Sequence, residues 1–118
     1  MKEAVVLIRS GPYGEASAAE GFRVIMTLPA MGLGTTVVAL EDGVFCLVKG
    51  GDGTRLGWRE SLYKVFAQSS DYEARLLVHK PSLLERGIKE EELVQHDGWL
   101  EEDELPSLLR RASVLLAF

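Results

Sequence analysis

Short apolar runs that alternate with helix-like segments constrain the fold of this chain more than any other feature. Four such runs, at 4–8, 35–40, 74–78 and 114–118, are built mainly from valine, leucine, isoleucine and alanine. An apolar run of this length is typical of a strand that is buried on both faces. Because a helix-like segment separates each run from the next, the sequence predicts βαβ units and a mostly parallel sheet between layers of helices.

Proline, glycine and acidic residues indicate where the helices begin and end. A first helix is predicted from Glu15, and Pro29 should end it or kink it. A second helix is predicted over 58–66, and a short one over 81–86 that starts at a proline and stops at a glycine. The acidic run 101–104 suits the positive end of a last helix, which precedes the final strand.

The segment 42–48 fits either a strand or a short helix. Asp42 as the N-cap residue, with Val44 and Leu47 on one face, favours the helix. On that helix Cys46 points away from the apolar face. We therefore expect Cys46 to be exposed or to lie at a subunit contact.

Length and charge limit the class of protein. A chain of 118 residues fits one domain, predicted over 1–118. Its net charge of −5 gives no basic surplus for phosphate backbones, so direct binding to nucleic acid is not expected. No apolar run approaches the ~18 residues of a membrane helix, and Arg9 ends the N-terminal run before it could serve as a signal peptide. We expect a cytoplasmic protein with no membrane association.

Metal and cofactor signals are weak in this sequence. The chain has one cysteine, Cys46, and two histidines, His79 and His96. A single cysteine excludes an internal disulfide, and these three residues do not have the spacing of metal ligands. The loop after the first predicted strand matches neither dinucleotide nor phosphate-loop motifs. We therefore expect no metal and no cofactor.

The carboxyl ends of parallel strands usually carry the functional site, and a glycine-containing loop lies at the first of them. In this loop Gly11, Tyr13 and Gly14 could hold a small anion, together with Asp42 after the second strand. The simpler interpretation is a tight turn between strand and helix, with Asp42 as a helix cap. Both interpretations stay open at this point.

Cys46 and His79 are the candidate catalytic residues. A cysteine near a helix N-terminus can have a lowered pKa and act as a nucleophile or sulfur carrier, although free cysteines are more often buried. His79 ends the third predicted strand, where it could be an acid–base group or simply cap the strand.

Five short motifs occur in order along nearly the whole chain: SGPYG at 10–14, AEGF at 19–22, DGVF at 42–45, SLLERGI at 82–88 and VLLAF at 114–118. Together they resemble the DsrE/DsrF-like sulfur-relay family, and within it the TusC/DsrF branch. Each motif alone is weak, but five in register are fairly specific.

The resemblance implies a three-layer α/β/α sandwich with a parallel five-stranded sheet. It also implies a homo-oligomer, or a hetero-oligomer with related DsrE-like and DsrH-like subunits, and exchange with a sulfur-carrier protein. In the family's complexes a cysteine on the DsrE-type subunit carries sulfur as a persulfide. TusC-containing complexes relay this sulfur toward 2-thiolation of tRNA, and DsrF-containing complexes serve sulfur oxidation.

One departure from the family bears on function. The family's cysteine lies after the third strand, just before the helix that contains 82–86, where this chain has His79-Lys80-Pro81. The resemblance therefore implies a structural or accessory partner in persulfide transfer. The alternatives are a small-ligand or anion-binding module and a sulfurtransferase that depends on Cys46, so the sequence leaves open whether the protein is an enzyme.

Overall fold

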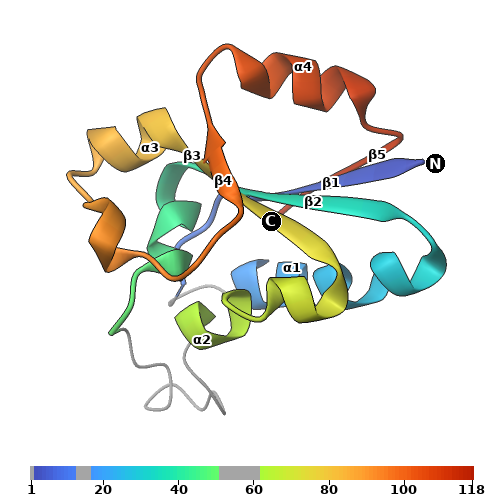
Figure 1. Cartoon of the computed structure of the whole chain (residues 1–118), viewed down its shortest axis with the longest axis horizontal. Helices are drawn as coiled ribbons and strands as arrows, with labels where there is room; N and C mark the ends of the chain where they lie inside the picture. Colours follow the sequence, from blue (N-terminus) through green and yellow to red (C-terminus); the bar gives the residue numbers. More distant parts are fainter. Residues whose placement is uncertain (1, 13–16, 51–61) are drawn as a thin grey trace.

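A computed structural model of the chain describes residues 2–12, 17–50 and 62–118. These residues form a five-stranded sheet in which every pair of neighbouring strands is parallel (Figure 1). The strands are β1 (Glu3–Ile8), β2 (Gly34–Ala39), β3 (Ala74–His79), β4 (Gly98–Leu100) and β5 (Val114–Ala117). Their order across the sheet is β4-β3-β2-β1-β5. The predicted parallel α/β sheet is confirmed.

Helices cover both faces of this sheet. The α-helices are α1 (Ser17–Thr27), α2 (Leu62–Phe66), α3 (Lys80–Glu85) and α4 (Glu104–Arg111). The 3-10 helices are η1 (Pro29–Met31), η2 (Glu41–Leu47), η4 (Ser69–Tyr72) and η5 (Glu90–Glu92). Helices α1 and α2 lie on one face and α4 crosses the other, which gives the three layers of an α/β/α sandwich (Figure 1).

Strand β1 shows why an apolar run predicts a strand that is buried on both faces. Ala4, Val6 and Ile8 belong to the core beneath α1, whereas Val5 and Leu7 belong to the core beneath α4. All five are 9% exposed or less. Side chains that alternate between two covered faces require an uninterrupted apolar run, because neither face meets water.

Most helix boundaries agree with the sequence signals. Helix α1 ends at Thr27, two residues before Pro29. Gly87 follows α3 with a φ of +64°, a left-handed conformation that favours glycine. The predicted start at Glu15 and the first part of the helix predicted over 58–66 lie outside the described residues. Among the helices that the structure describes, none is long and apolar enough to span a membrane.

The segment after β2 is helical, as the sequence favoured, but the type of helix and its cap differ from the prediction. It forms η2, whose N-cap is Leu40, and no side chain caps it, so the N-cap role predicted for Asp42 is wrong. A 3-10 helix has three residues per turn, and accordingly Asp42 and Phe45 are exposed while Gly43 and Cys46 are buried. The assumed α-helical period placed Cys46 on the wrong side of this helix.

Strand β4 has no counterpart among the four strands that the apolar runs predicted. The strand has three residues, begins at Gly98 and pairs with Leu77–His79 of β3. Three residues are too few to show a strand period. Only the resemblance to the family implied a fifth strand.

Candidate functional site

Three segments meet where the central strands end. Arg9 and Ser10 follow β1, η2 begins at Glu41 after β2, and α3 begins at Lys80 directly after His79. We refer to residues 9–10, 41–43 and 79–82 as the carboxyl edge. Its position agrees with the general location of functional sites in open parallel sheets.

A chain of two hydrogen bonds holds His79 at the carboxyl edge. Its Nδ1 lies 2.7 Å from the Oγ of Ser82, in the first turn of α3. The same Oγ accepts the backbone N–H of Glu41 at 2.8 Å. Ser82 is only 4% exposed. The imidazole is therefore oriented by a buried hydroxyl that is itself fixed by the backbone of η2.

Burial determines the charge of the His79 ring. It lowers the pKa of His79 below its ordinary value of 6.5, while the carboxylates of Glu102, Glu85 and Glu41 oppose this shift. The ring is partly exposed at the end of β3. Because the pKa is lowered, the ring is mainly uncharged at neutral pH.

Ion pairs neutralise the other charged groups of this edge. Arg9 Nε lies 3.1 Å from Glu41 Oε2, with both side chains about half exposed, at 54% and 51%. Arg86 Nε contacts Asp42 Oδ1 at 3.1 Å and thereby joins α3 to η2. Exposed pairs of this kind add little stability, in the range of ~0–1 kcal/mol. Their effect is to leave little uncompensated positive charge along the edge.

Gly43 allows η2 to pack against the end of β1. A Cβ at this position would lie 1.8 Å from the backbone oxygen of Ile8. That oxygen also accepts the N–H of Leu40 at 3.1 Å. Only a residue without a side chain permits this approach, so the glycine sets the distance between η2 and the strand.

Cys46 is buried beneath the same helix, and the prediction that it is exposed or at a subunit contact is wrong. Its side chain is 1% exposed, and its Sγ donates a hydrogen bond to the backbone oxygen of Ser10 at 3.4 Å. Burial raises the pKa of the Cys46 thiol to about 12. With such a pKa, roughly one thiol in 100,000 is ionised at pH 7. The thiolate needed for sulfur chemistry is therefore scarce and inaccessible.

A shallow cavity of about 250 Å³ opens beside the end of β1. Arg9, Ser10, Glu41, Ala117 and Phe118 line it. Its floor is the closing segment of the chain, since Phe118 O accepts the N–H groups of Arg9 and Ser10 at 2.7 and 3.2 Å. The cavity combines one guanidinium, one carboxylate and an aromatic ring.

The predicted loop site is described only in part. Gly11 is half-buried and has open space around its Cα. Tyr13 and Gly14 lie outside the described residues. Asp42 binds Arg86, so its carboxylate is engaged with α3. A ligand-binding role for these four residues stays a prediction.

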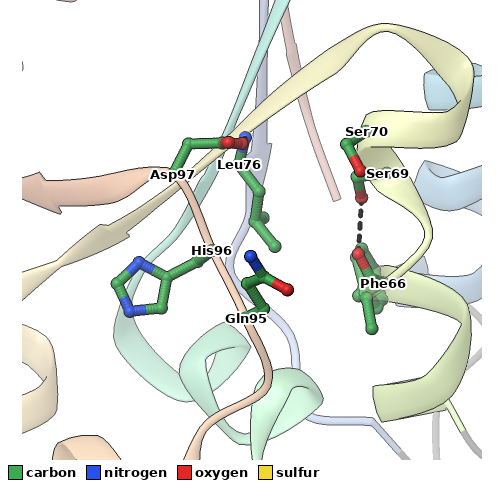
Figure 2. A pocket seen from close by; sticks show the side chains of 8 residues that line it. Phe66, Ser69, Ser70, Leu76, Gln95, His96 and Asp97 are labelled. Carbon is green, nitrogen blue, oxygen red and sulfur yellow. Dashed lines mark hydrogen bonds between the residues drawn. The ribbon is translucent and has the colours of Figure 1, made fainter.

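A smaller polar pocket of about 80 Å³ lies away from the carboxyl edge, between the end of α2 and the segment before β4. Figure 2 shows Gln95 pointing toward Phe66 and Ser69 across this pocket. Asp97 Oδ2 accepts the N–H of Leu76 at 2.7 Å, and Asp97 N–H donates to Leu76 O at 2.7 Å. Asp97 therefore provides hydrogen-bond partners for the backbone of β3 at Leu76, which β4 is too short to pair.

His96 serves local structure beside this pocket. Its Nδ1 accepts the N–H of Gly98 at 3.2 Å, and its ring packs edge-on against Trp99 with centroids 4.7 Å apart. Among the described residues no group of three or more histidine, cysteine, aspartate or glutamate side chains could hold a metal ion.

Comparison with protein families identifies the family of this chain. The model of the DsrE/DsrF-like family matches residues 2–118. The chain belongs to the DsrE/DsrF-like family. It is 31% identical over 96 residues to the intracellular sulfur oxidation protein DsrF of Allochromatium vinosum, across 80% of this chain and 70% of that protein. It is 28% identical over 120 residues to a TusC homolog of Vibrio parahaemolyticus, across the full length of both.

Solved structures support the same fold for this DsrE/DsrF-like chain. The ychN protein of E. coli superposes with a TM-score of 0.84 at 19% identity, over the full length of both chains. MTH1491 of Methanobacterium thermoautotrophicum superposes with a TM-score of 0.74 at 14% identity, also over the full length of both. At such identities the likeness shows the fold alone.

In this family member the two candidate catalytic residues have different surroundings. His79 lies in a hydrogen-bonded and partly exposed position, whereas Cys46 is buried under η2. The sequence analysis missed Ser82, although its spacing of three residues from His79 is a usable signal for contact across a first helical turn. It also missed the backbone N–H of Glu41, because a contact between residues 41 positions apart leaves no local pattern.

Proposed function

We propose that this chain is an accessory subunit of a cytoplasmic sulfur-relay assembly, in which a related subunit carries the persulfide. Membership of the DsrE/DsrF-like family supports the assignment to sulfur transfer. The relatives that it matches are named for sulfur oxidation and as a TusC homolog. The sulfur would pass to 2-thiolation of tRNA or to sulfur oxidation.

The observation that carries the accessory role is the burial of the single thiol. Cys46 is 1% exposed, and burial raises its pKa to about 12. A sulfur carrier needs an accessible thiolate to attack a donor persulfide and then to present its own. The buried thiol meets neither requirement, so the transferable sulfur would reside on another chain.

An accessory subunit must bind other subunits, and exposed apolar side chains near the carboxyl edge support such binding. Phe45 on η2 is 40% exposed and Leu84 on α3 is 68% exposed. Large apolar side chains at the surface are common at subunit contacts. We propose that the chain forms a homo-oligomer or a hetero-oligomer with DsrE-like and DsrH-like subunits, and that the isolated chain does not bind nucleic acid.

Affinity purification of the tagged chain from its native cells tests this proposal. We expect related small subunits to co-purify, and we expect sulfur supplied as a persulfide to be found on a cysteine of one of them. Thiolated tRNA or sulfur-compound turnover would be measured in cells that lack the chain, which distinguishes the two destinations. A chain that purifies alone and whose loss changes neither process would contradict the proposal.

The cavity at Arg9 supports a second candidate function, the binding of a small anionic ligand that displaces the Glu41 carboxylate from the Arg9 guanidinium. Its volume of about 250 Å³ is below the usual ~300–1,000 Å³ of sites for drug-sized ligands, so only a small molecule would fit. Titration with inorganic phosphate, followed by NMR shifts at Arg9 and Ser10, tests it. Shifts that survive Arg9→Gln would contradict a site built on this guanidinium.

A further inference from the structure

We propose that His79 presents an uncharged N–H donor to a sulfur anion on a partner chain, and that Ser82 is the residue that positions it. The proposal rests on the function proposed above and adds the role of the carboxyl edge within it. It assigns His79 to the binding of a thiolate or persulfide, not to proton transfer.

The direction of the Ser82 hydrogen bonds carries this inference. Ser82 Oγ accepts the N–H of Glu41 at 2.8 Å, so its own single proton needs a different partner. The residue is 4% exposed, and a buried hydroxyl proton is nearly always bonded. Among the described residues, the acceptor within reach of this hydroxyl is His79 Nδ1 at 2.7 Å.

This bonding selects one tautomer of the uncharged imidazole. When Nδ1 accepts the hydroxyl proton, the ring proton resides on Nε2, and the other ring nitrogen is a donor. Nδ1 faces the buried serine, so Nε2 is the nitrogen left to meet a partner chain at the partly exposed end of β3. Nε2 is therefore a hydrogen-bond donor.

The same bonding opposes protonation of the ring. An imidazolium carries a proton on Nδ1 as well, so Nδ1 could no longer accept the hydrogen bond from the Ser82 hydroxyl. The carboxylates of Glu102, Glu85 and Glu41 face the ring from the segment before α4, from α3 and from η2, and they favour the charged form. Burial outweighs them, and the pKa of His79 is lowered.

Sulfur exchange supplies an anion that such a donor can bind. An acceptor thiolate attacks the outer sulfur of a persulfide, one S–S bond forms as the other breaks, and the first cysteine leaves as a thiolate. Negative charge on sulfur is present before and after the step, and no oxidant or reductant is consumed. Arg9, Lys80 and Arg86 are each paired with a carboxylate, of Glu41, Glu101 and Asp42. The N–H of His79 is therefore a side-chain donor of the carboxyl edge that can stabilise this charge without breaking one of these ion pairs.

Two other roles for this pair conflict with its geometry. Ser82 is not a suitable nucleophile, because its Oγ is buried and engaged by two partners. A general base would need an unprotonated Nε2, which the Ser82 hydroxyl disfavours. Each of these roles predicts a different outcome in the experiments below.

NMR of the full chain labelled with nitrogen-15 histidine tests the tautomer directly. Above the pKa of the ring, we expect His79 to give the signals of the Nε2–H form. Ser82→Ala should produce a mixture of tautomers and raise the pKa of His79, whereas Ser70→Ala, at an exposed serine, should change neither. An Nδ1–H signal in the unmodified protein, or no response to Ser82→Ala, would overturn the proposal. Retention of the signal in Ser82→Thr would confirm that the hydroxyl is responsible.

Sodium hydrosulfide serves as the probe for a sulfur anion in the same samples. We expect it to shift the Nε2–H signal of His79 more than sodium chloride does at equal concentration. Equal shifts with the two salts, or no shift, would overturn the role toward sulfur. This test uses the isolated chain, so its result does not depend on finding the partner subunits.

Two substitutions distinguish a donor from an acid–base group within the purified assembly. The amide nitrogen of glutamine can replace the Nε2–H donor, so His79→Gln should retain most of the sulfur-transfer rate. His79→Ala should lose about tenfold, the effect of one hydrogen bond to a charged group. Equal loss in both variants would indicate proton transfer and overturn the proposal. Normal transfer in both would overturn it too, and would leave the sulfur-relay function itself intact.

Discussion

Replacing Gly43 by alanine should disrupt the carboxyl edge more than any other substitution that adds a single methyl group. The new Cβ would meet the backbone oxygen of Ile8 at 1.8 Å, whereas non-bonded carbon and oxygen atoms need more than 3 Å. No flexible side chain can move aside, because the obstacle is the backbone of a central strand. Helix η2 would have to shift away from β1, with loss of the bond from Leu40 N–H to Ile8 O.

The expected cost follows from that displacement. Overpacking of a well-packed site costs about 1–3 kcal/mol, and the lost backbone hydrogen bond adds about 1 kcal/mol. We expect Gly43→Ala to lower the free energy of unfolding by about 3 kcal/mol. For a chain of this size that corresponds to a fall in Tm of roughly 10 °C.

Urea and thermal unfolding, followed by circular dichroism, measure this effect. Gly11→Ala is the matched control, since a Cβ there would have nothing within 4 Å, and it should change stability by less than about 0.5 kcal/mol. A Gly43→Ala protein as stable as the control would refute the close approach of η2 to β1. It would also remove the basis for the bond between Glu41 and Ser82, because η2 carries that N–H.

Three further predictions concern single side chains. Cys46→Ser should keep the fold and any assembly and lose about 1–2 kcal/mol in chemical unfolding; loss of the fold would show that the thiol contributes more than packing. Asp97→Ala should lose about 1–2 kcal/mol because the buried N–H of Leu76 loses its partner, and an equal loss in the exposed-residue control Asp71→Ala would contradict this. The lowered pKa of His79 means that the unfolded chain binds more protons than the folded one as pH falls below about 6.5. The free energy of unfolding should therefore decrease as the pH falls through that range. Urea titrations of His79→Gln should show a weaker decrease, and an unchanged pH dependence in this variant would refute the lowered pKa of His79.

The apolar runs predicted the sheet because its central strands are covered on both faces. The run 114–118 also forms a strand, but β5 lies at the edge of the sheet and Leu115 is 49% exposed, so its predicted burial on both faces is wrong. Val5 and Val6 of β1 pack into separate cores, and this arrangement leaves a continuous apolar signal in the sequence. Strand β4 left none, because a strand of three residues is specified by its pairing with β3 and not by its own composition.

In the candidate site, only a residue's place at the end of a predicted strand could be predicted from the sequence. His79 was placed at a strand end from the run that precedes it, and the structure confirms that placement. The error at Cys46 came from assuming 3.6 residues per turn in a segment that has three. Within this helix Gly43 packs against the end of β1, a tertiary contact that the local sequence does not encode.

The mass of the intact protein after reaction with a persulfide donor tests the central claim most directly. The chain would be incubated with a persulfidated carrier protein, alone and within its purified assembly. The intact mass of each subunit would then be measured by mass spectrometry. We predict no addition on this chain and an increase of about 32 Da, one sulfur atom on a thiolate, on a partner subunit. Stoichiometric addition to this chain that disappears in Cys46→Ser would contradict the accessory role and identify Cys46 as the carrier.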